Sequence, residues 1–337
     1  MFFRRLIYQK KVLPGVLFFF CIQHALAKAN SLNALFKKND RIPEVSFPGL
    51  QPAAGSPDSS SFIIPFSRAG NLIIIKAKAD AEEGNFILDT GCPGLVLNIT
   101  YFRNYPVITE PDTESSGITG GAAPTEQVMI SDFNFGKAGQ YNIKANLANL
   151  GNIENSKGIK VLGLIGMQLF ARSELIIDYQ KNLLYFHFIS HAESGSYRHA
   201  MLKDTAAYYI IPFEITDGRM IVRSVIEGKK LRFIIDCAAE TSILDSRLPD
   251  KIFESLSVTG KVSLAGVGNK KVDAVTGSLA NFSIAGHDIK DLPVLITNLD
   301  KSCLSQGGCV DGVLGIDRLS LQKIGFNFNT HKMYIWK

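Results

Sequence analysis

Short runs of alternating apolar and polar residues fill most of this chain from about residue 61 onward. Examples are "NLIIIKAKA", "QVMISDFNFG", "RMIVRSVIEG" and "LANFSIAG", which lie between Gly, Asn, Asp and Ser residues. Such period-2 runs, rich in β-branched and aromatic residues, are typical of strands, and few segments keep a helical period of 3.6 over three turns. The pattern predicts an all-β fold with one or two short helices in each half, near residues 167–171 and 317–321.

The pattern occurs twice, which indicates an internal duplication. "IIPF" stands at residues 63–66 and again 147 positions later, at residues 210–213. Late in each copy, "LIGMQLF" (164–170) corresponds to "VLGIDRL" (313–319), and an apolar pair of strands follows each of them. A repeat of this length predicts two homologous lobes, each large enough to bury its own core.

The segments outside the two copies differ from them in composition. "FPGLQPAAGSPDSS" is dominated by Pro, Gly and Ser, and "SHAESGSYRHAMLKDTAA" is polar and small, so both read as connecting segments. The predicted organisation is a signal peptide (1–27), a flexible lead-in (28–60), an N-terminal lobe (61–189), a linker (190–207) and a C-terminal lobe (208–337).

The N-terminus has the features of an export signal. Four basic residues precede an apolar run from Val12 to Ile22, and Ala25 and Ala27 give a small-x-small cleavage site. The apolar run is too short to cross a bilayer as a helix, and no later stretch is long enough. The sequence therefore predicts an exported protein, periplasmic or secreted, without a transmembrane span.

Charge argues against a nucleic-acid partner. Removal of residues 1–27 takes away four of the 36 Lys and Arg and none of the 31 Asp and Glu, so the net charge falls to 32 minus 31, or +1. No basic run with interleaved aromatic residues occurs elsewhere.

Four cysteines remain after the signal segment. Cys303 and Cys309 bracket "LSQGG", a short stretch that can turn, and an exported protein meets an oxidising compartment, so a bridge between them is expected. The alternative is two free thiols, because a short loop does not guarantee disulfide geometry. The spacings CxxC and HxxEH are absent, so we expect no metal site and no cofactor.

Two related stretches contain the candidate catalytic residues. "FILDTGCPGLVL" (86–97) and "FIIDCAAETSIL" (233–244) each lead an apolar strand into an aspartate, Asp89 and Asp236. A lone aspartate at a strand end is commonly a turn residue, but the duplication places two of them in equivalent positions.

The first stretch resembles the active-site motif of the aspartic peptidases, two apolar residues followed by Asp-Thr-Gly. The second copy and the elements Leu164-Ile165-Gly166 and Val313-Leu314-Gly315 extend the resemblance over the chain from about residue 61. It implies the bilobal, pepsin-like arrangement of two retropepsin-like repeats: all-β, with two homologous lobes of the acid-protease β-barrel type and the active site between them.

The resemblance also implies that Asp89 and Asp236 form a catalytic dyad. Two carboxyl groups about 3 Å apart share one proton and supply a base and an acid together. The family's supporting positions are occupied here by Thr90, Gly91 and Cys92 in the first copy and by Cys237 and Ala238 in the second.

The supporting residues of the second copy depart from the family pattern. Cys237 replaces the Thr hydroxyl by a weak S–H donor, and Ala238 adds a methyl group in a tight loop. We therefore expect a working Asp236 with weakened hydrogen-bond support, so that Cys237→Thr with Ala238→Gly increases cleavage and moves the acid limb of the pH profile downward. Cys92 is expected to weaken support at Asp89 in the same way.

Glycine-rich stretches could form the flap that covers the cleft in this family. "SSGITGGAAPTEQV", with Gly117, Gly120 and Gly121, could form its tip, and Gly266 and Gly268 mark a counterpart in the second copy. The alternative for both is an ordinary hairpin turn.

Two functions fit the motifs. One is an exported aspartic endopeptidase acting as a monomer on peptides or unfolded proteins. The other is a catalytically degenerate relative that binds extended peptides by strand addition without cleaving them. A serine or cysteine hydrolase is disfavoured, because no G-x-S-x-G occurs and no histidine is an obvious partner for Cys92 or Cys237.

Overall fold

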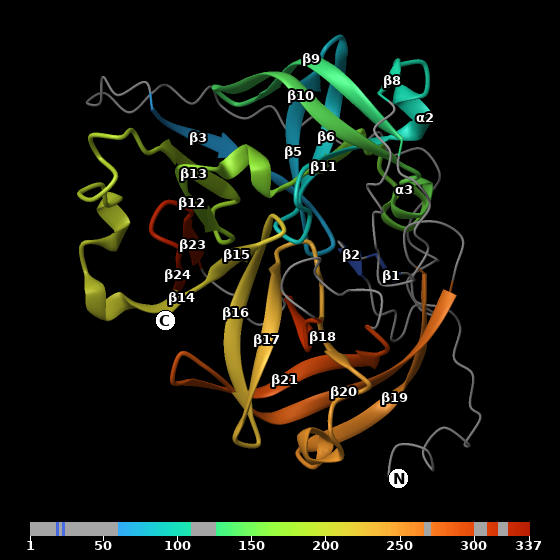
Figure 1. The fold of residues 1–337 in the computed structure, drawn as a ribbon, viewed down its shortest axis with the longest axis vertical. Coiled ribbons are helices and arrows are strands. Elements are labelled where there is room, and N and C mark those ends of the chain that lie inside the picture. Colours follow the sequence, from blue (N-terminus) through green and yellow to red (C-terminus); the bar gives the residue numbers. More distant parts are fainter. Residues whose placement is uncertain are drawn as a thin grey trace.

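Two similar β-sheets and a third sheet beside them make up the described part of the chain (Figure 1). The computed structural model describes residues 18–19, 22–23, 60–108, 126–265, 271–299, 309–315 and 323–337. The prediction of an all-β fold with two similar lobes is confirmed.

The first lobe is an eight-stranded sheet that closes on itself, because β5 also pairs with β9. Its strands in spatial order are β4 (Ser67–Ala69), β5 (Leu72–Ala79), β6 (Glu82–Leu88), β11 (Gly163–Ile165), β7 (Leu95–Asn98), β10 (Ala138–Ala148), β9 (Gln127–Phe135) and β8 (Val107–Ile108). Closure leaves the six strands from β5 to β9 without a free edge.

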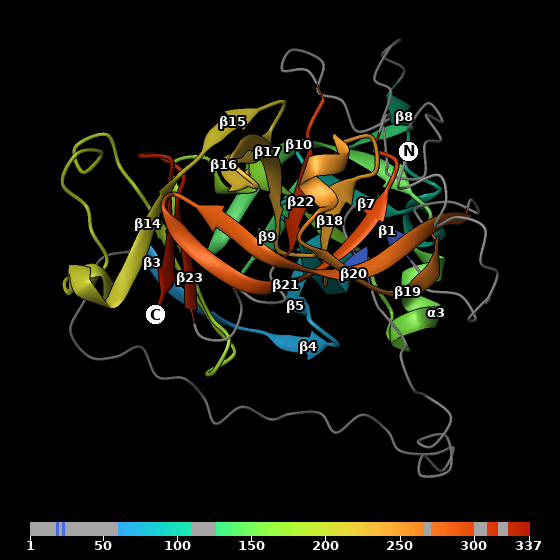
Figure 2. The ribbon, with the colours of Figure 1, turned by 90° about the horizontal axis from the view of Figure 1, so that it is seen from below.

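The second lobe repeats this order and closes through β16 and β20. Its strands are β15 (Glu214–Thr216), β16 (Arg219–Ile226), β17 (Lys229–Asp236), β22 (Gly312–Gly315), β18 (Ser242–Asp245), β21 (His287–Thr297), β20 (Lys271–Ile284) and β19 (Leu256–Ala265). Figure 1 shows the first lobe above and the second below, and Figure 2 shows the second lobe from its far side.

Equivalent aromatic pairs fill the two lobe interiors. Phe86 and Phe133 meet edge to face in the first lobe, with ring centroids 5.4 Å apart, and Phe233 and Phe282 do so at 5.5 Å in the second. All four side chains are buried. The apolar side of each alternating strand therefore faces a core of its own, as the period-2 pattern predicts.

A third, six-stranded sheet combines strands from both halves. Its order is β14 (Tyr208–Pro212), β24 (Lys332–Trp336), β23 (Lys323–Asn327), β12 (Ser173–Asp178), β13 (Leu183–Phe188) and β3 (Ser61–Pro65). The halves join where β12 pairs antiparallel with β23, with Ile176 opposite Gly325 and Glu174 opposite Asn327. The strand pairs predicted at the end of each copy form hairpins, but their pairing with each other was not predicted.

Residues 190–207, called the connector below, lie against this third sheet. Leu202 is completely buried and packs with Tyr208 and Tyr334. Tyr197 stacks on the buried ring of His187 at 3.6 Å, and the backbone N–H of His199 donates to Glu174. Although its sequence is polar, the connector is packed onto the fold.

Helices in the described residues are short: α2 (Ile99–Phe102), α3 (Gly151–Lys157), and the 3-10 helices η1 (Met167–Phe170), η2 (Ala200–Leu202), η3 (Thr205–Ala207) and η4 (Asp250–Phe253). The short helix predicted near residues 167–171 is found as η1, and its counterpart near 317–321 lies outside the described residues. Two short strands, β1 (Phe18–Phe19) and β2 (Ile22–Gln23), pair within the predicted signal segment. None of the described helices has the length and apolar character needed to cross a membrane.

Candidate active site

Asp89 is held in a tight turn directly after β6. Its backbone N–H donates to Ile165 O (3.0 Å), and its side-chain Oδ1 accepts hydrogen bonds from the N–H groups of Gly91 (2.9 Å) and Cys92 (3.0 Å). The side chain is completely buried. The carboxyl group is therefore fixed by its own loop, with Oδ1 bound to the backbone of that loop.

Asp236 repeats this arrangement at the end of β17. Its Oδ1 accepts from the N–H groups of Ala238 (2.8 Å) and Ala239 (3.1 Å), and Asp236 pairs in parallel register with Gly315 of β22. Only 1% of the residue is exposed. The methyl group of Ala238 does not prevent the loop from closing on its carboxylate.

The carboxyl group of Asp236 lies against the loop that carries Asp89, since a Cβ built on Gly91 would lie 2.5 Å from its Cγ. Burial, and then the negative charge of Asp89, raise the pKa of Asp236 well above its ordinary value, and a hydrogen bond between the two side chains acts in the same direction. Hydrogen bonds from Ala238 and Ala239 act in the opposite direction. Because the charge of one carboxyl group raises the pKa of the other, the titrations of the two groups depend on each other.

Thr90 and Cys237 cross-link the two loops in a reciprocal way. Thr90 Oγ1 accepts from Cys237 N–H (2.8 Å) and donates to Ile235 O (3.2 Å). Cys237 Sγ accepts from Thr90 N–H (3.3 Å) and donates to Leu88 O (3.3 Å). The thiol thus takes both bonding positions that the hydroxyl takes on the other side.

This geometry shows that Cys237 still supports the second loop, through the weaker bonds expected of a thiol. Sulfur bonds are longer and weaker than those of a hydroxyl, but both partners remain satisfied. Burial, followed by the charges of Asp236 and Asp89, raises the pKa of the Cys237 thiol, so the group stays protonated and can donate to Leu88. We therefore now expect Cys237→Thr to change activity only slightly.

Cys237→Ala tests the contribution of the sulfur directly. The substitution leaves the buried Thr90 N–H and Leu88 C=O without their partner, which costs about 1–3 kcal/mol. We expect the melting temperature to fall by roughly 2–10 °C for a chain of this size, and Cys237→Thr to preserve it. Differential scanning calorimetry of both variants measures this, and an unchanged melting temperature in the Ala variant would show that the cross-link contributes nothing.

The glycines of the site allow close approach of the loops. A Cβ built on Gly91 would lie 2.5 Å from Cγ of Asp236. One on Gly166 would lie 2.6 Å from Cys92 O, and one on Gly315 would lie 2.7 Å from Ala239 O. Each active-site loop therefore passes directly over a glycine of the apolar-apolar-Gly element of its own lobe.

The remaining predicted residues fall into two groups. Cys92 is buried, its Sγ donates to Gly94 O (3.3 Å), and its backbone N–H donates to Asp89 Oδ1. Cys309 is disulfide-bonded, but its predicted partner Cys303 lies outside the described residues, so the pairing stays a prediction. The predicted flap residues, Gly117, Gly120, Gly121, Gly266 and Gly268, also lie outside the described residues.

Sequence reasoning missed two contacts beside the dyad. Glu240, four positions after Asp236, binds Lys157 and the backbone of Asn71. Arg219 Nε donates to Gly91 O at 3.4 Å. Glu240 stands in the second motif where the first has Pro93, and this charged residue in an otherwise apolar and small stretch was the one available signal.

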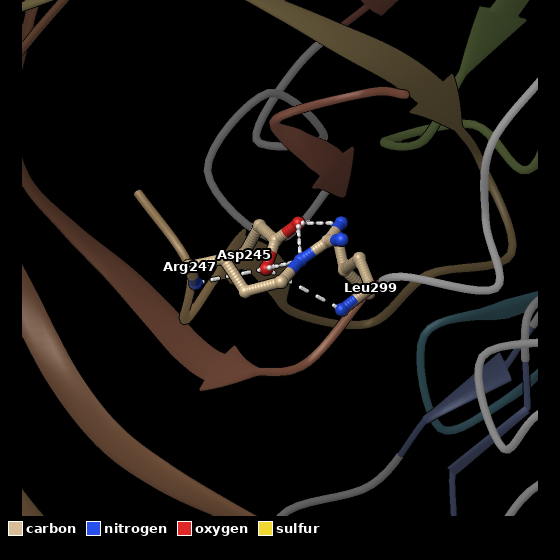
Figure 3. A network of polar contacts seen from close by, with 3 residues as sticks. All are labelled: Asp245, Arg247 and Leu299. Carbon is tan, nitrogen blue, oxygen red and sulfur yellow. Dashed lines mark hydrogen bonds and ion pairs between the residues drawn. The ribbon is translucent and has the colours of Figure 1, made fainter. Parts of the chain in front are cut away.

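Another buried carboxylate of the second lobe has a structural role. Asp245 is the last residue of β18. Its Oδ1 and Oδ2 accept hydrogen bonds from Nε of Arg247 at 3.1 and 3.0 Å, and its Oδ1 accepts one from the N–H of Leu299 at 3.5 Å (Figure 3). These bonds hold the segment after β21 against the end of β18. Among the described residues, no group of three or more His, Cys, Asp or Glu is placed to hold a metal ion.

A sequence model of the family described as "Aspartyl protease" matches residues 222–318, which include Asp236 and the second apolar-apolar-Gly element. No curated protein matches the sequence.

Several solved structures are similar to the chain. An aspartic proteinase from Irpex lacteus is 9% identical, with a TM-score of 0.47, and the match covers 82% of this chain and 97% of that one. Basic 7S globulin from soybean is 10% identical over 82% of this chain and 94% of that one, with a TM-score of 0.41. A retropepsin-like aspartic protease from Rickettsia conorii is 20% identical over 38% of this chain and 90% of that one, with a TM-score of 0.27.

Proposed function

We propose that this chain, which has the bilobal arrangement of the aspartic peptidases, is an exported endopeptidase that hydrolyses peptide bonds with Asp89 and Asp236. The observation that carries the proposal is the close packing of two equivalent loops: each buried carboxyl group is held by two backbone N–H groups of its own loop, and a Cβ on Gly91 would lie 2.5 Å from Cγ of Asp236. The cross-linked loops keep the pair in register.

The geometry suits activation of water by a pair that shares one proton. The ionised carboxyl group takes a proton from water while the neutral one donates its proton to the substrate carbonyl oxygen, which gives a tetrahedral intermediate. The pair then gives a proton to the leaving nitrogen and takes one from a hydroxyl group of the intermediate as the C–N bond breaks, which yields the amine and the carboxylic acid and restores the shared proton. Because each Oδ1 is fixed by backbone N–H groups, little reorganisation is needed during the reaction.

The expected substrate is a peptide or an unfolded protein, and one copy of the chain suffices. Both carboxyl groups come from the same chain, which supports action as a monomer. Export is proposed from the basic, apolar and small-x-small segments of residues 1–27. Mass spectrometry of the exported protein should find a start within a few residues of Lys28, and a retained Met1 would contradict this part of the proposal.

Cleavage of an unfolded protein across pH tests the catalytic proposal. Activity should follow a bell-shaped profile, since it is lost at low pH when both carboxyl groups are protonated and at high pH when both are ionised. Because burial and Asp89 raise the pKa of Asp236, the pair keeps its shared proton to higher pH, and the alkaline limb should extend toward neutrality. Pepstatin should inhibit the cleavage.

The outcome separates the two functions. Absence of cleavage at every pH, together with tight binding of pepstatin, would favour the peptide-binding alternative. Absence of both cleavage and pepstatin binding would reject both functions. The presence of both carboxyl groups in fully formed loops supports the enzyme over the binding protein.

A further inference from the structure

Glu240 connects the second active-site loop to the first lobe. Its Oε1 accepts a hydrogen bond from Asn71 N–H (2.8 Å), in the turn between β4 and β5. Its Oε2 lies 2.9 Å from Nζ of Lys157, the last residue of α3. The two side chains are 3% and 5% exposed, so this is a buried ion pair between the lobes.

The duplicated half makes a different contact at the equivalent place. Pro93 occupies the position of Glu240 in the first loop and faces Gly218, in the turn between β15 and β16, where an added Cβ would lie 2.7 Å from Pro93 Cβ. One side of the site is therefore closed by an apolar contact and the other by two opposite charges. Only the charged side belongs to the loop of Asp236.

We propose that Glu240 is a positioning residue for the dyad: it holds the loop that carries Asp236 against the first lobe, while Lys157 cancels its charge beside the two aspartates. This inference rests on the proposed function, because it assigns a role within that same site. A buried carboxylate in the same loop as Asp236, four residues after it, would otherwise disfavour the ionised form that the reaction needs. The ammonium group removes that effect.

The other charged and ionisable groups at the dyad are few in the described part of the chain. Cys237 stays protonated, and Arg219 lies beyond the carbonyl oxygen of Gly91. Tyr179 interacts with Cys237, and burial raises its pKa well above the ordinary value. Changes at Glu240 and Lys157 should therefore be seen directly in the titration of the two aspartates.

Opposite substitutions give opposite expected results. In Glu240→Gln, the amide oxygen still accepts from Asn71, but Lys157 keeps an uncompensated positive charge, so the apparent pKa of the dyad should fall. In Lys157→Met, the positive charge beside Glu240 is removed, so the apparent pKa of the dyad should rise. Each shift should be roughly 0.5–1 pH unit, and the double variant should return to the wild-type value.

Titration of the protein labelled with ¹³C at aspartate Cγ, followed by NMR, measures these shifts whether or not the chain cleaves peptides. A shift in the same direction for both variants, or none in either, would overturn the inference. If the shifts appear but no cleavage is found, the proposed function fails and the placement of charge at the dyad stands.

The control is the exposed pair Glu214–Arg223 in the same lobe, whose side chains are 53% and 66% exposed; Glu214→Gln should leave the titration unchanged. If Lys157→Met does not fold, the other two variants decide the outcome. The inference then requires a lower apparent pKa of the dyad in Glu240→Gln and the wild-type value in the double variant. Where cleavage is measurable, Glu240→Gln should lower kcat several-fold with little change in KM, because the loop that loses its ion pair carries a reacting carboxyl group.

Discussion

Asp236→Asn is expected to lower kcat for an unfolded protein substrate about 1,000-fold, within the range that general acid–base groups contribute. The amide keeps an oxygen that can accept from Ala238 and Ala239, so the loop remains closed. It cannot share a proton with Asp89 in the two protonation states that the reaction uses. Asp89→Asn should have the same effect, and steady-state kinetics of both variants measures it.

The same substitution has a predicted effect on stability that serves as its folding control. The raised pKa means that folded Asp236 keeps its proton where the unfolded chain has lost it, so wild-type stability falls as the pH rises from about 4 toward the folded pKa. The Asn variant lacks this loss and should be relatively more stable at neutral pH. Wild-type kcat in Asp236→Asn, with Asp89→Asn inactive, would mean that Asp89 acts without Asp236.

Gly91→Ala is expected to lower kcat about 100-fold with a small change in KM. The new Cβ would lie 2.5 Å from Cγ and Oδ2 of Asp236, a distance that side chains do not tolerate, so the carboxyl group must move by roughly 1 Å. A displacement of that size at a reacting group is enough for a loss of this order.

Gly195→Ala is the matched control, because a Cβ at this connector position meets nothing within 4 Å. Its kcat and melting temperature should match the wild type. If Gly91→Ala kept wild-type kcat, the carboxyl group of Asp236 would not need its present position.

The sequence predicted the parts of the site that lie on single strands. Asp89 and Asp236 were located because each ends an apolar strand at the same distance from a repeated "IIPF", and Gly166 and Gly315 because the elements that contain them recur. These features depend on the residue pattern of single strands and on the duplication. Both can be recognised directly in the amino-acid sequence.

Contacts between distant segments were not predictable in the same way. Cys237 was judged by its weak donor strength, whereas its effect depends on the positions of Thr90 N–H and Leu88 C=O, 147 and 149 residues away. Glu240 and Lys157 are 83 residues apart, and no spacing rule joins them. The polar connector was read as a linker because its one fully buried anchor, Leu202, cannot be distinguished by composition.

The pairing of β12 with β23 has the symmetry of an interface between identical subunits. Ile176 lies opposite Gly325, its own counterpart in the second copy at an offset of 149. Glu174 lies opposite Asn327, which is the counterpart of Asp178. Asp178 in turn lies opposite Lys323, the counterpart of Glu174, so the pairs on either side of Ile176 are reciprocal; such a contact is isologous, with a two-fold axis through its centre. A chain of half this length could therefore close the same sheet with a second copy of itself, and the connector joins two halves whose register is already fixed by that axis.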